Sequence, residues 1–151
     1  MKAKATYSVK KWEENTYDQI SPEMKMTKAS VEYEFSGEIE GKASVEYLMF
    51  YSHDDPTDQH KSSASYVGLM RFEGTLAQRV VDDPTRRESS TGRSGSFVMK
   101  DDGTFESGAA SSTLRIEEGS GTGSLQGIKG AGMYGADQNG IRFELEYELD
   151  M

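Results

Sequence analysis

The sequence contains no cysteine and has only three prolines and two histidines among its 151 residues. The absence of cysteine excludes disulfides, thiolate metal sites and a cysteine nucleophile, so packing must stabilise the fold. No apolar run approaches the roughly 20 residues that a membrane-spanning helix needs, and the N-terminal residues lack the apolar segment of a signal peptide. We therefore expect a cytoplasmic protein that does not bind membranes.

Basic residues are also scarce, with 17 Lys and Arg against 26 Asp and Glu, which gives a net charge of -9. Such a surface repels phosphate backbones, so nucleic acid is not an expected partner. The length fits one domain over residues 1–151. Hydrophobic residues make up only 34% of the chain, but 8 tyrosines and 6 phenylalanines in alternating patterns argue against disorder.

Large apolar and charged side chains alternate along residues 140–149. The apolar set consists of Ile141, Phe143, Leu145, Tyr147 and Leu149. Successive side chains of a strand point to opposite faces, so this pattern predicts a strand with one face in the core and one in water. A helix would spread the same apolar residues around its circumference.

The same period of two predicts further strands in residues 4–12, 28–36, 43–51, 63–74, 95–100 and 104–116, with one bent strand in the glycine-rich residues 119–135. The first of these places Lys11 on the inner face and Trp12 on the outer face. Asp101-Asp102-Gly103 is interpreted as a tight turn between two strands. About eight strands with consecutive hairpins favour a closed antiparallel β-barrel, because closure hides both sheet edges.

Two segments contain residue types found in ligand sites, but we interpret both as ordinary parts of the fold. In the glycine-rich stretch, Lys129 is followed by Gly130 rather than by Ser or Thr, so the phosphate-binding loop pattern is not met. Residues 53–61 hold both histidines and three aspartates, but without a recognised ligand spacing. We interpret the first segment as a bent strand and the second as a solvated hairpin loop, and we predict no metal site and no cofactor.

In each predicted strand every second residue faces the interior, and we call these positions the inner parity. They are rich in aromatic residues and methionine. The inner parity comprises Tyr33, Tyr47, Met49, Tyr66, Met70, Phe72, Phe97, Met99, Phe143 and Tyr147. An eight-stranded barrel holds side chains or one small ligand, so these residues either fill the core or line a ligand cavity. If there is a cavity, the predicted ligand-binding residues are Tyr47, Met49, Tyr66, Met70, Phe97 and Tyr147.

The alternate positions that face outward, the outer parity, are mostly acidic, as expected of a solvated face. Two groups of residues among them differ from this pattern. Arg71 and Glu73 share one face of a strand and could pair with Glu46 across the sheet. The second group is apolar where the pattern is otherwise polar, and it consists of Leu48, Phe50, Val67 and Leu69. Contiguous apolar patches mark association surfaces, so we expect a homo-oligomer through this second group.

Six pieces of the chain, taken in order, resemble a family of small, mostly bacterial proteins of unknown function. The pieces are residues 27–30, 35–41, 45–49, 66–69, 92–98 and 121–127, among them Phe-Ser-Gly-Glu-Ile-Glu-Gly at 35–41. That family is similar in fold to the allene oxide cyclases, so the resemblance implies an allene-oxide-cyclase-like antiparallel barrel. It implies no activity, because none of the functional residues of the plant cyclases matches a position of this chain.

Three hypotheses about function follow. The first is a barrel that binds an apolar or amphipathic small molecule in its mouth. The second is an isomerase or cyclase that confines its substrate and uses one glutamate, Glu46 or Glu73, if that residue faces inward with a raised pKa. The third is an assembly module with a filled barrel and no ligand. No Ser-His-Asp, paired-acid or metal arrangement has support from spacing.

Overall fold

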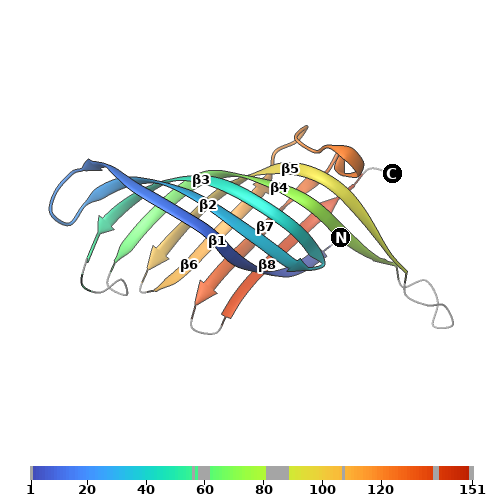
Figure 1. Ribbon diagram of the computed structural model, residues 1–151, viewed down its shortest axis with the longest axis horizontal. Coiled ribbons are helices and arrows are strands. Elements are labelled where there is room, and N and C mark those ends of the chain that lie inside the picture. The colour runs from blue at the N-terminus through green and yellow to red at the C-terminus, as the bar shows by residue number, and fades with distance from the viewer. Residues whose placement is uncertain are drawn as a thin grey trace.

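The computed structural model describes residues 2–55, 57, 62–80, 89–106, 108–137 and 140–149, with the backbone alone for 77–80, 89–91 and 137. Eight antiparallel strands follow one another in chain order and close into a barrel (Figure 1). The expected all-β barrel is therefore confirmed. The strands are β1 (Lys2–Gln19), β2 (Lys25–Gly37), β3 (Ile39–His53), β4 (Ser63–Val80), β5 (Ser89–Glu106), β6 (Ala109–Ile116), β7 (Lys129–Asp137) and β8 (Gly140–Glu148).

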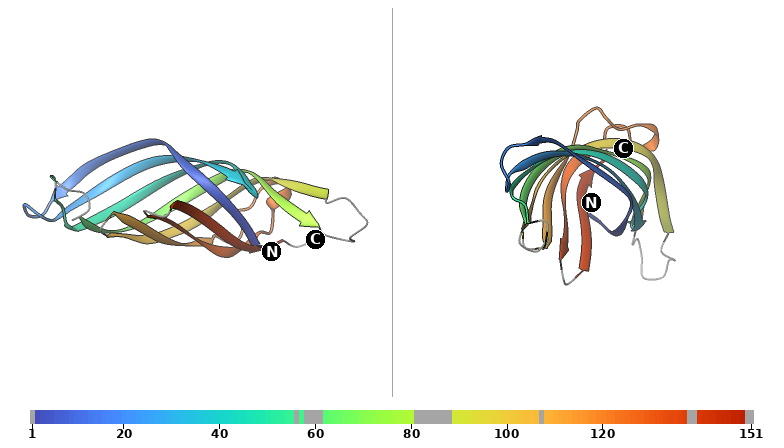
Figure 2. Two further views of the ribbon diagram at one scale, coloured as in Figure 1. Left: turned by 90° about the horizontal axis from the view of Figure 1, so that it is seen from below. Right: turned by 60° about the vertical axis from the view of Figure 1, so that its left-hand side comes forward.

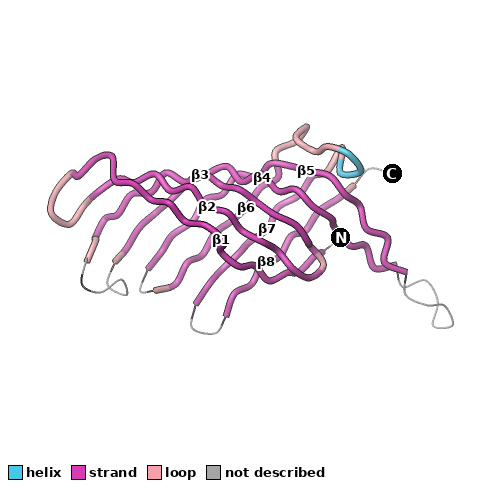
Figure 3. Tube along the Cα trace, viewed as in Figure 1, coloured by secondary structure: helices cyan, strands magenta, loops and turns pink. Residues whose placement is uncertain are grey.

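Helix is nearly absent from the described part of the chain. Figure 3 shows a single short helical segment between β6 and β7, the 3-10 helix η2 (Gly123–Leu125). Within the described residues, no helix has the length and apolar character required to span a membrane.

The barrel closes over a short stretch at one end. β1 pairs with β8 only from Lys2, opposite Glu146, to Ala5, opposite Phe143, although β1 continues to Gln19. Figure 2 shows the two strands diverging from the N-terminus onward. We call the end with the β3–β4, β5–β6 and β7–β8 hairpins the mouth, and the end with both termini the sealed end.

The interior follows the period of two that the sequence predicts. All ten aromatic and methionine residues named above for the inner parity, from Tyr33 to Tyr147, are buried. The rings of Phe35 and Phe143 pack edge-on with centroids 4.8 Å apart, and those of Phe72 and Phe97, which are opposite each other on β4 and β5, pack at a tilt with centroids 5.2 Å apart. Side chains thus fill the half of the barrel nearest the sealed end.

The segment between β6 and β7 covers the sealed end. Because β6 is short, it pairs with β5 only from Met99 onward, and residues 117–122 hydrogen-bond to the adjacent part of that edge, at Ser96 and Val98. The Thr122 amide donates to the Ser96 carbonyl at 2.8 Å, and the Val98 amide donates to Ser120 Oγ at 3.0 Å. This crossing carries Leu125 and Ile128 into fully buried positions. Only the later part of the predicted bent strand, β7, is a strand.

Two sequence interpretations of strand ends are wrong. Asp101-Asp102-Gly103 is not a turn, because β5 runs without a break from Ser89 to Glu106. The Asp101 side chain points inward, and a Cβ on Gly103 would meet Ser112 Oγ and the Tyr66 ring, so packing explains this glycine. β4 also continues beyond Gly74, as far as Val80.

On the outer face the apolar patch forms as a contiguous surface. Leu48 lies opposite Val67 across β3 and β4, and both are about half exposed, as is Leu69. Phe50, opposite Ser65, is only half-buried. Self-association through this patch stays a prediction.

The predicted cross-strand charge pairing is wrong in its partners. Arg71 pairs with Glu73 of its own strand, with Nη1 and Oε2 3.1 Å apart. Glu46 instead accepts a hydrogen bond from Ser30 Oγ at 2.6 Å. Two neighbouring charged side chains on the outer face of β4, Arg71 and Glu73, therefore form an ion pair with each other.

Candidate functional site

A cavity of about 350 Å³ lies at the mouth of the barrel. Aromatic and aliphatic side chains form most of its wall, and three of them stand half exposed at the rim, Val9, Trp12 and Ile141. Val9 and Trp12 belong to β1 and Ile141 to β8, the two strands that part beyond Ala5. Ile141 keeps the inner parity predicted for it, but it is 45% exposed because no strand pairs with β8 on that side here.

A β-bulge in β1 decides which side chains reach the rim. Val9 pairs with Tyr33 and Lys11 with Glu32, so Lys10 is the extra residue and the inner parity changes from odd to even. Trp12 and Glu14 therefore line the cavity. The expectation that Lys11 faces inward and Trp12 outward is wrong for this reason, since a single inserted residue moves every later side chain to the other face.

Glu14 is held at the rim by three donors. Thr27 Oγ1 and Tyr51 Oη donate to its Oε2 at 2.8 and 2.7 Å, and Trp12 Nε1 donates to its Oε1 at 3.1 Å. A carboxylate accepts all three bonds, and it fixes the Trp12 indole and the Tyr51 ring in the wall. Glu14 thus organises the rim.

The floor of the cavity is a cluster of tyrosine hydroxyls around one carboxylate, contributed by β2, β3, β5 and β7. Tyr47 and Tyr134 both donate to Asp101 Oδ2, at 2.9 and 2.8 Å. Their hydroxyl oxygens are 2.7 Å apart, and Tyr33 Oη lies 3.1 Å from Tyr47 Oη. Beside them Tyr66 Oη is hydrogen-bonded to Ser112 Oγ. The four tyrosines line the cavity, whereas Asp101 lies behind them and is only 1% exposed.

Asp101 is an acid in a poorly solvated position. Burial raises its pKa to about 6, against the hydrogen bonds from Tyr134 and Tyr47 that favour the charged form. Its second oxygen, Oδ1, has no hydrogen-bond partner among the described residues. The surrounding tyrosines have pKa values raised chiefly by burial, that of Tyr33 to about 12, so they stay protonated. Asp101 is the member of the cluster that titrates near neutral pH.

The six predicted ligand-binding residues divide into two groups. Tyr47, Met49 and Tyr66 line the mouth cavity. Met70, Phe97 and Tyr147 are buried nearer the sealed end and do not line it. Their role in binding stays a prediction.

Neither of the two glutamates proposed for catalysis faces inward, as that role would require. Glu46 and Glu73 are exposed on the outer face, so the hypothesis that one of them faces inward is wrong. The period of two places each of them on the outer face of its strand, as it does Glu32 and Glu34 of β2. The acids that point inward are Glu14 at the rim and Asp101 beneath the floor.

Sequence reasoning missed several residues of this site. Asp101 was interpreted as part of a turn, Glu14 and Trp12 depend on a bulge that leaves no sequence signal, and Tyr134 lies in the glycine-rich segment. For Tyr134 a signal existed: Gly132, Tyr134 and Ala136 alternate with outward residues, so the aromatic falls on the inner face of β7.

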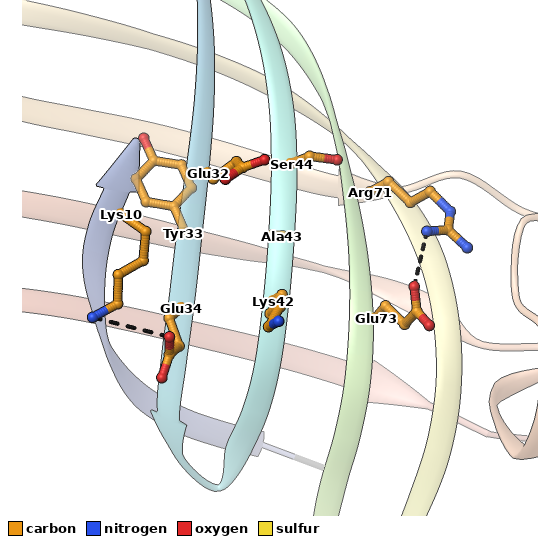
Figure 4. Close-up of a pocket in the computed structure, with 9 residues that line it drawn as sticks. All are labelled: Lys10, Glu32, Tyr33, Glu34, Lys42, Ala43, Ser44, Arg71 and Glu73. Carbon is orange, nitrogen blue, oxygen red and sulfur yellow. Dashed lines mark hydrogen bonds and ion pairs between the residues drawn. The ribbon is translucent and has the colours of Figure 1, made fainter. Parts of the chain in front are cut away.

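A second hollow, of about 320 Å³, lies on the outer face of β1 to β4 (Figure 4). Two pairs of its charged side chains are in contact: Lys10 Nζ lies 3.9 Å from Glu34 Oε2, and Arg71 pairs with Glu73. Exposed pairs of this kind contribute little to stability. We interpret the hollow as the solvated face of the sheet.

The histidine-containing loop falls largely outside the described residues. Of residues 53–61, the structure describes 53–55 and 57. Within the described chain, no group of three or more His, Asp or Glu side chains is arranged to hold a metal ion.

Comparison with known proteins identifies relatives of the whole chain. A family model described as "Protein of unknown function (DUF3224)" matches residues 3–80 and 86–149. A crystal structure of a protein with unknown function from the DUF3224 family of Shewanella oneidensis MR-1 is similar, with a TM-score of 0.68 and 18% sequence identity. The match covers 100% of this chain and 98% of that one, and at this identity it shows a shared fold. No curated protein matches the chain.

Proposed function

Because the chain belongs to the DUF3224 family, which is described as having unknown function, we propose a function from its own geometry: the barrel binds a small molecule in its mouth. The ligand has an apolar body and one polar group. The body lies against the aromatic wall, and the polar group reaches the tyrosine hydroxyls of the floor.

One observation carries this proposal, the placement of a hydroxyl cluster at the bottom of an otherwise apolar cavity. Ligand sites are concave, mostly apolar and provided with a few convergent polar groups, and they measure about 300–1,000 Å³. The mouth cavity, at about 350 Å³, is at the small end of this range. A barrel that only needed a core could fill these positions with phenylalanine, as it does nearer the sealed end with Phe72 and Phe97.

Equilibrium dialysis with 2-methoxynaphthalene tests the proposal. This probe is neutral and small, and it has an apolar body with one polar atom. We expect wild-type protein to bind it, and Ala136→Trp, which places an indole in the cavity, to weaken binding at least tenfold. Ala131→Trp is the matched control, because Ala131 lies on the same strand with its side chain exposed on the outer face.

Failure of the wild-type protein to bind either this probe or 2-naphthol, which has the same ring system with a hydroxyl, would contradict the proposal. Equal affinity in Ala136→Trp and wild type would contradict it too, because the probe would then occupy some other place. Circular dichroism of both tryptophan variants establishes that each retains the strand content of the wild type.

A further inference from the structure

The hydroxyl cluster on the cavity floor has more oxygen contacts than protons when Asp101 is ionised. Tyr33, Tyr47, Tyr134 and Asp101 Oδ2 make four contacts of 2.7 to 3.1 Å. Each hydrogen bond requires one proton, and the three hydroxyls supply three. A protonated Asp101 supplies the fourth, and every contact is then a hydrogen bond.

The direction of these bonds determines what the cavity presents to a ligand. With Asp101 ionised, Tyr47 and Tyr134 donate toward the carboxylate and Tyr33 donates to Tyr47. All three protons then point away from the cavity, so the floor presents oxygen lone pairs. With Asp101 protonated, the three contacts among Asp101, Tyr47 and Tyr134 form a closed ring of hydrogen bonds. Tyr47 then already accepts a bond within the ring, so the Tyr33 proton can either complete the fourth bond, to Tyr47, or turn toward a ligand.

The tyrosines around Asp101 stay neutral where Asp101 titrates, so the charge of the cluster depends on the protonation of Asp101. Tyr7 of β1, Tyr33 of β2, Tyr47 of β3, Tyr66 of β4, Ser112 of β6 and Tyr134 of β7 surround it on the inner side. Arg142 of β8 acts on Tyr7 rather than on Asp101. Burial raises the pKa values of these tyrosines, so they remain neutral where Asp101 titrates. Asp102 is exposed on the outer face.

We propose that, at neutral pH, the mouth cavity selects apolar molecules whose polar group is a hydroxyl that donates a hydrogen bond to the tyrosine cluster. This inference rests on the proposed function and defines its ligand class as alcohols and phenols. The ligand hydroxyl donates to the lone pair of a tyrosine oxygen whose own proton points away from the cavity, and the hydrogen-bonded tyrosines transmit the effect of the Asp101 charge to that oxygen. Asp101 acts as a positioning residue, because the tyrosines separate it from the cavity.

The test compares 2-naphthol with 2-methoxynaphthalene, which has the same ring system but no donor. A tyrosine that donates to an ionised carboxylate is polarised into a stronger acceptor, and for a donor on that tyrosine we expect a gain of about 1 kcal/mol, the margin of hydrogen bonds to charged groups over neutral ones. At pH 7.5 we therefore expect wild-type protein to bind 2-naphthol about five- to tenfold more tightly, measured by equilibrium dialysis. At pH 5.2, where Asp101 is mostly protonated, we expect the preference to fall below twofold.

Two matched variants assign the preference to Asp101. Asp101→Asn stays neutral at both pH values, so its preference should be small and independent of pH. Asp102→Asn makes the same change one residue away on the outer face, and it should keep the wild-type preference and its pH dependence. The pH series on wild-type protein tests the inference even if Asp101→Asn fails to fold.

The outcomes separate this inference from the function on which it rests. If neither probe binds, the proposed function is wrong, and the inference is wrong with it. If both bind equally at pH 7.5, or if the preference does not change with pH, the cavity binds ligands but does not select a hydroxyl donor. A preference retained in Asp101→Asn would equally overturn the role of the carboxylate.

Discussion

The sealed end and the mouth of this barrel use the same strand pattern with different side chains. Toward the sealed end the inward positions hold Phe72, Phe97 and Met70 in close contact, and Leu125 covers them. Toward the mouth the inward positions hold tyrosines around Asp101, and space remains beside them. Alternation determines which side chains face inward, whereas the chemistry of those side chains determines whether the interior is core or site.

The two halves of the barrel interior also differ in what they contribute, the filled half to stability and the polar half to a site. Close-packed side chains stabilise a fold through buried area and dispersion contacts. Buried hydroxyls and a carboxylate stabilise it less, because desolvation opposes their hydrogen bonds. Natural proteins tolerate such groups mainly where they serve a site.

The largest expected effect comes from shortening one methionine in each half. Met70→Ala should lower the free energy of unfolding by about 4 kcal/mol, because it leaves a void in a close-packed region. Met49→Ala makes the same change in the cavity wall and should cost about 2 kcal/mol, since the new space joins an existing cavity and only the transfer free energy of the side chain is lost. Urea unfolding of both variants measures the difference.

Equal losses of unfolding free energy in Met70→Ala and Met49→Ala would contradict the contrast between the sealed end and the mouth. They would show that the wall around Met49 is packed as closely as the surroundings of Met70, and that the mouth is not a separate region in energetic terms.

A somewhat smaller effect should appear when pH is varied. The pKa of Asp101 is about 6 in the folded protein against 3.8 in an unfolded chain, so between these values the folded state holds the extra proton. Stability is therefore fully present below about pH 4 and decreases as pH rises to about 6, by about 3 kcal/mol in total. Asp101→Asn should lack this decrease, whereas Asp102→Asn should keep it.

Unfolding free energies of the three proteins at a series of pH values provide the measurement. Subtracting the Asp101→Asn curve from that of the wild type removes the contributions of the other carboxylates. A flat difference curve, or one that rises with pH, would show that Asp101 is solvated and that the mouth differs from the sealed half only in shape.

The smallest effect is expected outside the barrel, where neither half is disturbed. Leu69→Lys should change the free energy of unfolding by less than about 0.5 kcal/mol, because Leu69 is already more than half exposed. If copies of the chain associate through Leu48, Val67 and Leu69, the same substitution should reduce that association in sedimentation velocity runs. A wild-type protein that stays monomeric at millimolar concentration would contradict the association.

The fold was predictable because its signal is local and repeated. Of the five odd-numbered apolar residues from 141 to 149, four are buried as the alternation requires, and β2 and β3 follow the same rule. Closure into a barrel followed from the number of strands. The strand ends were harder, because Asp-Gly favours turns in most contexts, and here only the tertiary contacts of Asp101 and Gly103 override that preference.

The site was only partly predictable, because it depends on two features that leave no trace in a single sequence. The bulge at Lys10 exchanges the faces of β1 and places Trp12 and Glu14 in the rim. The hydroxyl cluster joins residues as far apart as Tyr47 and Tyr134, which only the closed barrel brings together. Parity alone identified Tyr47, Met49 and Tyr66 as inward residues but could not show that Met70, Phe97 and Tyr147 lie in the filled half.

The cover formed by Leu125 and Ile128 affects the kinetics of any occupant. With that end filled, the passage between β1 and β8, flanked by Val9, Trp12 and Ile141, serves for both arrival and departure. A bulkier side chain on this passage that does not touch the bound molecule would slow both steps by the same factor. Residence time would then lengthen while the dissociation constant stayed the same.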